Sequence, residues 1–204
     1  MERLTPFTST FTPYNQGDWV FNLPSPEFGD HVDGWEHNMI RFQSGEPQAV
    51  WYSQHANGEA FTYAAVQKQG IRPLAFVANG SHANYATSGT HDHTIPNVNL
   101  PGGPLEYHCD EGTLWDPTLA AYEYSYANTS NTFTLYSGSA SPNWLYFEGH
   151  WGDTQLPDSA LGQVDIFGQR KYVGGPTGPL DKVLDRTAVC LDANSQTYFD
   201  SLAF

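Results

Sequence analysis

The sequence predicts a mainly β protein, an antiparallel β-sandwich with one or two short helices and a long loop over one end. The 19 glycines and 14 prolines are spread along 204 residues, which is typical of many short elements joined by turns. Aromatic and charged residues each make up 15% of the chain, a composition typical of a packed globular protein. Two packed sheets would bury the Trp and Tyr side chains between them.

The length of the chain allows one sizeable core or two very small ones, and we expect a single domain over residues 1–204. Residues 1–18 are polar and Thr-rich at their start, so an irregular N-terminal arm is expected there, without the pattern of a signal peptide. No apolar run approaches the ~20 residues that span a bilayer, so no transmembrane segment is predicted.

A hairpin is expected first, because residues 35–42 and 48–55 are rich in β-formers and flank the turn signal Ser44-Gly45-Glu46-Pro47. If the turn is centred on Gly45 and Glu46, Glu36 lies opposite His55 and Ile40 lies opposite Trp51. A shift of one residue would turn these side chains to the other face of the sheet.

The next segments alternate between regular and irregular patterns. Residues 59–69 read as a short helix that ends at Gly70, and residues 74–78 form an apolar run typical of a buried strand. Residues 87–113 are rich in Gly, Pro, His and Asn, which predicts a long loop over one end of the sandwich. Further strands are expected at 122–126, 132–136 and 144–147, followed by a Gly/Pro turn at 174–178.

The charge distribution argues against a nucleic-acid partner. The formal net charge is −14, and residues 73–169 contain ten acidic residues but no Lys or Arg. Nucleic-acid surfaces need clustered positive charge, which is missing here. An acidic surface suits cation binding, or it serves only to keep the protein in solution.

The eight histidines are the strongest chemical signal, because each has an Asp, Glu, Ser, Gln or Asn within two residues. Imidazoles and carboxylates together can hold a metal ion or act as general acid and base. The expected catalytic residues are Glu36, His55, His82, His150 and Asp153. The expected ligands of a divalent metal, zinc or calcium, are His37, His55 and His82.

A small-molecule or carbohydrate ligand would be held by nearby aromatic and polar side chains, namely Trp35, Arg41, Asn84, Tyr85 and Trp115. A plainer interpretation is that the tryptophans pack in the core and that Asp116 and Asp153 cap turns.

Cys109 and Cys190 are the two cysteines, and two thiols do not define a disulfide framework. If they pair, closing the long loop stabilises the fold by roughly 4 kcal/mol on the entropic model. Asn79-Gly80-Ser81 and Asn128-Thr129-Ser130 are glycosylation sequons, which together with a disulfide would indicate a secretory route.

Several of these motifs occur in a familiar order. They are Trp35-Glu36-His37, Ser53-Gln54-His55, Gly80-Ser81-His82-Ala83-Asn84-Tyr85-Ala86, Gly112-Thr113-Leu114-Trp115-Asp116-Pro117, Gly149-His150-Trp151-Gly152-Asp153 and Gly175-Pro176-Thr177-Gly178-Pro179. In this series the chain resembles the vacuolar protein sorting-associated protein 62 family. The resemblance favours a secreted or vacuolar location and implies no established reaction. The family usually has Gly-Asp before Trp-Glu-His, whereas this chain has Asp33-Gly34.

Three functions follow from these residues. The favoured one is a metal-dependent enzyme, hydrolytic in type, in which a metal activates water or polarises a substrate oxygen. The second is a metal-free acid/base enzyme, of isomerase or lyase type, that uses Glu36–His55 or Asp153–His150 on an apolar small molecule. The third is a non-catalytic β module that binds carbohydrate, lipid or protein. Convergence of Glu36, His55 and His82 would distinguish the enzymes from the binding module.

Overall fold

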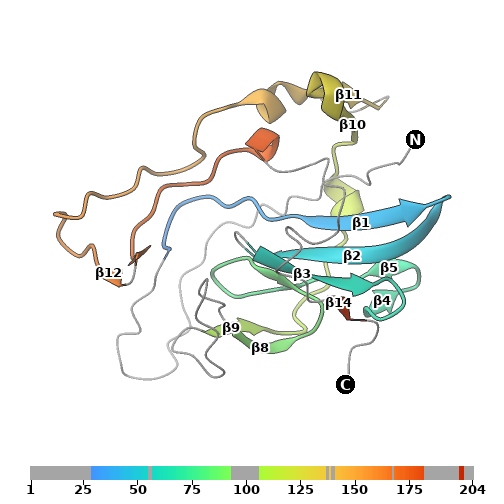
Figure 1. Cartoon of the computed structure of the whole chain (residues 1–204), viewed down its shortest axis with the longest axis horizontal. Helices are drawn as coiled ribbons and strands as arrows, with labels where there is room; N and C mark the ends of the chain where they lie inside the picture. Colours follow the sequence, from blue (N-terminus) through green and yellow to red (C-terminus); the bar gives the residue numbers. More distant parts are fainter. Residues whose placement is uncertain are drawn as a thin grey trace. The chain divides into compact units, whose positions relative to one another are not determined.

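The structure is a computed structural model that describes residues 29–54, 57–92, 106–136, 138, 141–166, 168–181 and 198–199. It is mainly β, and the sheets are antiparallel apart from one short parallel pair, which confirms the predicted class (Figure 1). Contacts divide the chain into two compact units. Unit 1 comprises Met1–Ser9, Glu36–Ala140 and Asp185–Phe204, and unit 2 comprises Thr10–Trp35 and Ser141–Leu184.

Unit 1 is built on a four-stranded sheet with the order β1-β2-β3-β14. The strands are β1 (Asn38–Gln43), β2 (Glu46–Gln54), β3 (Asn57–Thr62) and β14 (Tyr198–Phe199). Residues 49–53 are buried in succession, which identifies β2 as a central strand covered on both faces.

The hairpin of β1 and β2 forms as predicted, but its register is shifted by two residues next to the turn and, beyond a bulge between Arg41 and Phe42, by one residue. Asn38 pairs with Tyr52 and Ile40 pairs with Val50. The turn consists of Ser44 (φ 53°) and Gly45 (φ 88°), the two positive φ values of a type I′ turn. The predicted turn on Gly45 and Glu46 is wrong because it would put the bulkier Glu46 in the left-handed region.

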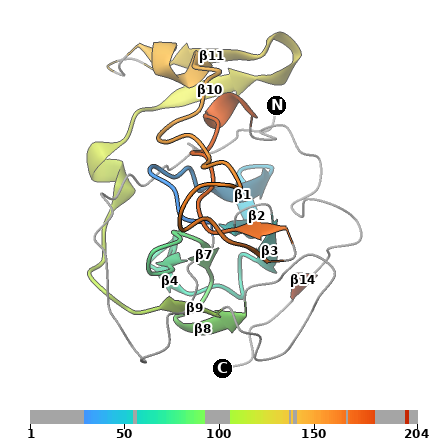
Figure 2. The same ribbon diagram turned by 90° about the vertical axis from the view of Figure 1, so that its left-hand side faces the viewer.

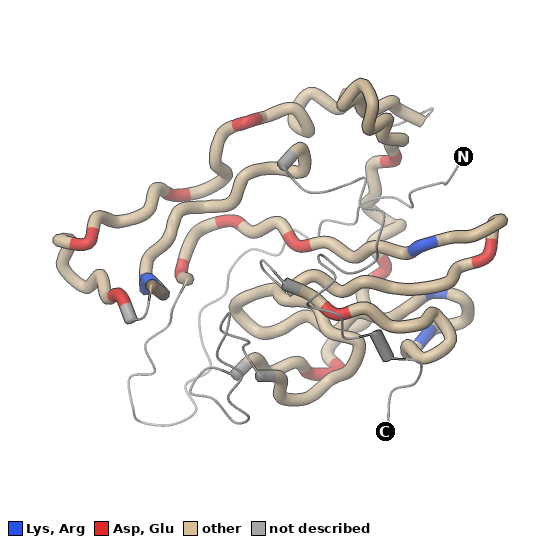
Figure 3. The backbone as a smooth tube through the Cα atoms, in the orientation of Figure 1, with Lys and Arg blue, Asp and Glu red and all other residues tan. Residues whose placement is uncertain are grey.

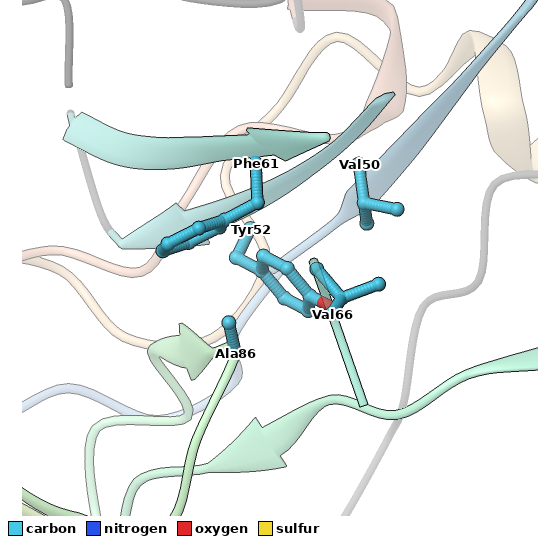
Figure 4. Packing of buried hydrophobic residues seen from close by; sticks show 5 residues of the cluster. All are labelled: Val50, Tyr52, Phe61, Val66 and Ala86. Carbon is cyan, nitrogen blue, oxygen red and sulfur yellow. The ribbon is translucent and has the colours of Figure 1, made fainter. Parts of the chain in front are cut away.

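One face of the sheet carries the main core of unit 1, formed by Val50, Tyr52, Phe61, Val66 and Ala86 (Figure 4). The rings of Tyr52 and Phe61 meet edge to face at 6.0 Å, and the Tyr52 hydroxyl donates to the Leu74 carbonyl at 2.9 Å. The other face buries Trp51 and Ala60.

The short helix predicted at 59–69 is absent, because residues 57–62 pair with β2 along their whole length. Ala60 and Phe61 point into cores on opposite faces of the sheet, which is the two-residue period of a strand. A Cβ atom at Gly58 would lie 2.2 Å from the Trp51 ring, so this glycine allows β3 to approach β2 closely. Among the described residues, the helical turns are all short 3-10 turns.

Small hairpins complete unit 1 (Figure 2). They are β4 (Lys68–Gln69) with β5 (Arg72–Pro73), β6 (Phe76–Val77) with β7 (Asn84–Tyr85), β8 (Gly89–Asp92) with β9 (Glu106–Cys109), and β10 (Tyr124–Ala127) with β11 (Thr132–Leu135). The strands predicted at 122–126 and 132–136 are therefore present. The loop predicted at 87–113 contains the β8–β9 hairpin instead of being irregular throughout its described part.

Unit 2 contains little regular structure in its described part. Its elements are the 3-10 turn η3 (Pro142–Tyr146), the hairpin of β12 (Asp165–Ile166) with β13 (Gln169–Arg170), and the 3-10 turn η4 (Pro179–Asp181). The strand predicted at 144–147 is wrong, because Pro142 opens a helical turn in which Trp144, Leu145 and Tyr146 lie. The sandwich arrangement and the N-terminal arm stay predictions, and the arm lies outside the described residues.

Charge is distributed as the composition suggests. Figure 3 shows acidic residues along the backbone of each unit and few basic ones. Arg170 pairs with Asp158 at 2.8 Å on the surface of unit 2. None of the helices in the described ranges is long and apolar enough to cross a membrane.

Candidate functional site

His82 lies in a tight turn between β6 and β7. The Ala78 amide donates to the Ala83 carbonyl at 2.8 Å, and the His82 amide donates to the Ala78 carbonyl at 3.2 Å. His82 has a φ of 61° and Gly80 a φ of 80°, so both residues use the left-handed region to close the turn. The motif Gly80-Ser81-His82 is therefore explained at the backbone level by this turn.

Asn84 and Tyr85 follow the turn and point into the fold. Only 4% of Asn84 and 2% of Tyr85 is exposed, and the Gln54 side chain donates to the Asn84 carbonyl at 3.1 Å. The Tyr85 ring stacks on the His91 imidazole with centroids 3.8 Å apart. Their predicted role in contacting a ligand stays a prediction.

The imidazoles of His91 and His108 contact neighbouring groups. His91 donates from Nε2 to the Thr87 carbonyl at 3.0 Å, and His108 Nδ1 lies 3.0 Å from the Thr90 hydroxyl. Burial raises the pKa of the Tyr107 hydroxyl, and the negative charge of Glu36 adds to this shift. Glu36 therefore lies within electrostatic range of Tyr107.

His55 lies outside the described residues, so the convergence of His37, His55 and His82 stays a prediction. The predicted pairing of Glu36 with His55 depended on the hairpin register that is wrong. His37 instead accepts a bond from the Ser53 amide through its carbonyl oxygen, at 3.2 Å. The described residues contain no group of three or more His, Cys, Asp or Glu placed to hold a metal ion.

Three further residues of unit 1 that the sequence singled out are Asp116, Trp115 and Arg41. Asp116 caps the 3-10 turn η1 (Pro117–Ala120), accepting from the Thr118 amide at 3.0 Å and the Thr118 hydroxyl at 2.7 Å. These bonds, with Arg72 beside it, lower the pKa of Asp116. Trp115 is half exposed, and Arg41 lies half-buried on β1.

In unit 2, two of the motifs lie against each other. The Trp151 amide donates to the Pro176 carbonyl at 2.8 Å, and the Gly175 amide donates to the Asp153 carbonyl at 2.9 Å. His150 forms an antiparallel bridge with Thr177. Gly149-His150-Trp151-Gly152-Asp153 and Gly175-Pro176-Thr177-Gly178-Pro179 therefore form one paired structure.

Glycine is required where these segments touch. A Cβ atom at Gly175 would lie 1.6 Å from the Trp151 carbonyl oxygen, and one at Gly178 would lie 2.8 Å from Trp151 Nε1. At Gly152, which has a φ of 91°, a Cβ atom would lie 2.0 Å from the Val32 carbonyl oxygen. Side chains at these positions would force the three segments apart.

A third segment, residues 29–35, completes the arrangement. Asp153 accepts the Val32 amide through its carboxylate, and the Asp30 amide donates to the Lys171 carbonyl at 2.7 Å. The Trp35 ring stacks on Trp144 at 5.8 Å and meets the edge of Trp151 at 5.3 Å. Phe147 also contacts Trp151, at 5.4 Å. Trp35 thus packs among the aromatic rings of unit 2.

These rings line a pocket of about 720 Å³. The lining residues are Asn143, Trp144, Tyr146, Phe147, His150, Trp151 and Gly152. Phe147 is 48% exposed and Tyr146 is 38% exposed, so their rings reach the surface. His150 is held by a 2.7 Å bond between its Nδ1 and the Gly175 carbonyl.

His150 and Asp153, predicted as an acid/base pair, thus each bond to the backbone of another segment, and catalysis by them stays a prediction. Asn143, Tyr146 and Phe147 were not predicted as site residues, because the apolar run around them was interpreted as a strand. The signal that could have identified them is Pro142, a proline suited to the first position of a helical turn.

The fold and the pocket define a mainly β protein whose glycine-rich motifs frame an aromatic site. The family described as vacuolar protein sorting-associated protein 62 matches residues 10–161, and the chain belongs to this family. This confirms the resemblance.

Two relatives from Saccharomyces cerevisiae are similar along most of the chain. One is TDA6, provisionally named a vacuolar protein sorting-associated protein, which is 38% identical over 199 residues, covering 88% of this chain and 42% of the relative. The other is vacuolar protein sorting-associated protein 62, which is 36% identical over 197 residues, covering 88% of this chain and 41% of the relative. The chain thus spans about two fifths of the length of these relatives. No solved structure matches the chain significantly.

The expectation of a metal-dependent hydrolase is wrong. The family and both relatives are named for vacuolar protein sorting, and these names describe a role in sorting instead of hydrolysis.

Proposed function

We propose that this chain is a non-catalytic recognition module in vacuolar protein sorting, and that the aromatic pocket of unit 2 is its binding site. The names of the family and of both relatives support the sorting role. A vacuolar or secreted location, as the resemblance favours, is part of the same proposal.

One observation carries the proposal. The concave site of unit 2 is lined by half-exposed rings that three distant segments hold in place, whereas the imidazoles of His91 and His150 bond to backbone carbonyls. Binding sites for small ligands are concave and mostly apolar, with a few polar groups that fix orientation. Aromatic rings provide such a surface with little loss of conformational freedom, since few torsions must be fixed on binding.

The test is a sorting assay in yeast. In a strain lacking both relatives, the matching segment of vacuolar protein sorting-associated protein 62 is replaced by this chain, and the secreted fraction of a soluble vacuolar marker protein is measured. We expect the unmodified chain to restore sorting and Tyr146→Ala to abolish this, because Tyr146 lines the pocket.

The matched control is Tyr122→Ala, which removes a 56% exposed tyrosine of unit 1 outside the pocket and should leave sorting intact. Glu36→Gln tests the enzymatic alternative in the same strain and should also leave sorting intact. Loss of sorting in Glu36→Gln together with normal sorting in Tyr146→Ala would contradict the proposal.

A further inference from the structure

The lining of the unit 2 pocket restricts the charge of its ligand. Of the seven lining residues, none is Asp, Glu, Lys or Arg. A phosphate or carboxylate group would find no cationic partner there, and a metal ion would find no anionic one. The pocket therefore suits an uncharged ligand.

The polar groups of the pocket require a ligand that also forms hydrogen bonds. A carbonyl oxygen can only accept, so the bond to the Gly175 carbonyl places the proton of the neutral His150 ring on Nδ1. Its Nε2 is then an acceptor, and the amide of Asn143 in the same lining offers both donors and an acceptor. An acyl chain or an aliphatic side chain would cover these groups without satisfying their hydrogen bonds, which is unfavourable.

The aromatic rings of the lining offer the ligand an apolar surface. Phe147 and Tyr146 are 48% and 38% exposed, and together with Trp144 they present apolar surface beside the polar groups. The hollow of about 720 Å³ is shallow and largely open to solvent, so it would cover one face of a ligand. A sugar ring combines the two required features, because its C–H groups form an apolar face and its hydroxyls both donate and accept.

We propose that this pocket binds an uncharged pyranose ring, with the sugar face on Tyr146 and Phe147 and its hydroxyls bonded to Asn143 and His150 Nε2. The inference rests on the proposed recognition function and names the class of ligand that this site recognises. A glycan on a sorted protein and a free saccharide share this chemistry.

The test is a titration of the whole chain followed by the NMR signals of the tryptophan indole N–H groups. The probes are the methyl glycosides of glucose, mannose, galactose and N-acetylglucosamine, each added up to about 50 mM to reach millimolar dissociation constants. Glucose 6-phosphate tests an anionic ligand, and N-acetylleucinamide tests an apolar side chain. We expect at least one methyl glycoside to shift the signals of Trp144 or Trp151 saturably, and to bind more tightly than the last two probes.

Variants locate the binding. Tyr146→Ala and Asn143→Ala should each weaken binding of the glycoside at least about fivefold, which corresponds to ~1 kcal/mol. Tyr122→Ala, in unit 1, should leave it unchanged, and urea unfolding of each variant establishes that it is folded. No saturable shift with any glycoside, tighter binding of N-acetylleucinamide, or equal binding by all folded variants would overturn the inference.

The two proposals fail differently. If Tyr146→Ala abolishes sorting but no glycoside binds, the recognition function stands and the ligand class falls. If glycosides bind at Tyr146 but sorting does not depend on this residue, the proposed function falls instead.

Discussion

At the scale of single residues, Asp33 takes a backbone conformation that favours glycine. Its φ is 65°, and it lies beside Gly152, where a Cβ atom would come within 3.4 Å of the Asp33 Cβ. The family pattern places glycine at this position and aspartate at the next. Residues 31–37 are not in a strand, so exchanging the two residues does not move a carboxylate between the faces of a sheet. It places a side chain in a left-handed position instead.

We therefore predict that Asp33→Gly stabilises the protein by about 0.5–1 kcal/mol, because glycine adopts positive φ without a steric penalty. Asp33→Ala is the control, since it removes the carboxylate but keeps the Cβ atom in the left-handed region. The measurement is the urea midpoint at constant m-value. An equal gain for glycine and alanine would mean that the carboxylate, and not the backbone, is responsible.

Cys109 illustrates a residue whose surroundings suppress its chemistry. It is 2% exposed, and burial together with the charge of Asp110 raises the pKa of its thiol to about 11. At pH 8 only about one thiol in a thousand is then ionised, whereas an unperturbed thiol ionises far more. We predict that iodoacetamide modifies Cys109 at least about tenfold more slowly in the folded chain than in urea.

Mass spectrometry of the labelled chain measures this rate and also tests the predicted disulfide. Cys190 lies outside the described residues, so its pairing with Cys109 stays a prediction. If Cys109 is labelled in urea only after a reductant is added, the two cysteines are paired. Rapid labelling of the folded chain would show that Cys109 is not buried as described.

The same thiol links stability to pH. In its thiol form, Cys109 keeps its proton up to about pH 11 in the folded chain, while the unfolded chain releases it near the ordinary value of 9.0. The unfolded state thus binds fewer protons between these values, and the free energy of unfolding falls as pH rises through this window. We predict that Cys109→Ala makes this decline less steep, because the difference in bound protons between the folded and unfolded states falls by up to one. An unchanged slope in urea titrations between pH 8 and 11 would contradict this.

At the scale of elements, the β1–β2 turn shows what fixes a register. Ser44 and Gly45 occupy the two central positions of the type I′ turn, where Asn-Gly is the preferred pair. We predict that Ser44→Asn stabilises the chain by about 0.5 kcal/mol, since asparagine tolerates positive φ better than serine. Glu46→Asn is the matched control and should bring no gain, because Glu46 already belongs to β2. If thermal unfolding shows that Glu46→Asn stabilises the chain and Ser44→Asn does not, the turn lies on Gly45 and Glu46 instead.

The elements were predictable where local chemistry decides them. The β1–β2 hairpin and the strands β10 and β11 follow from β-formers beside turn residues. The 59–69 segment was mistaken for a helix, because its identity as β3 depends on pairing with β2 and on the closeness that Gly58 permits. No local pattern of residues 57–62 contains that information.

The site was less predictable for the same physical reason. Gly149-His150-Trp151-Gly152-Asp153 stood out in the sequence, but its partners in space are residues 29–35 and 175–178. The sequence shows that the histidines are capable of metal binding and acid/base catalysis. It does not show which bonds they form in the fold, such as the bond from His150 to the Gly175 carbonyl, 25 residues away.

At the scale of the whole molecule, the buried apolar side chains are concentrated in unit 1. Of the buried hydrophobic residues described, Leu145 lies in unit 2 and the others lie in unit 1. Hydrophobic burial is the main stabilising contribution to folding, so unit 2 depends more on the close approach of its three segments. A change at the point of contact should therefore affect unit 2 before unit 1.

We predict that Gly175→Ala loosens unit 2 while the β1–β2–β3 sheet persists, because the added Cβ would lie 1.6 Å from the Trp151 carbonyl oxygen. Hydrogen exchange measures this directly: the amides of Trp151 and Gly175 should lose protection by at least about tenfold, and those of β2 should keep it. Gly168→Ala is the control, since Gly168 also lies in unit 2 but has open space around its Cβ position. Its positive φ costs only local strain, of about 1 kcal/mol. If Gly175→Ala instead lowers protection in β2 and at Trp151 by the same factor, residues 1–204 unfold as the single cooperative domain that the length of the chain suggests.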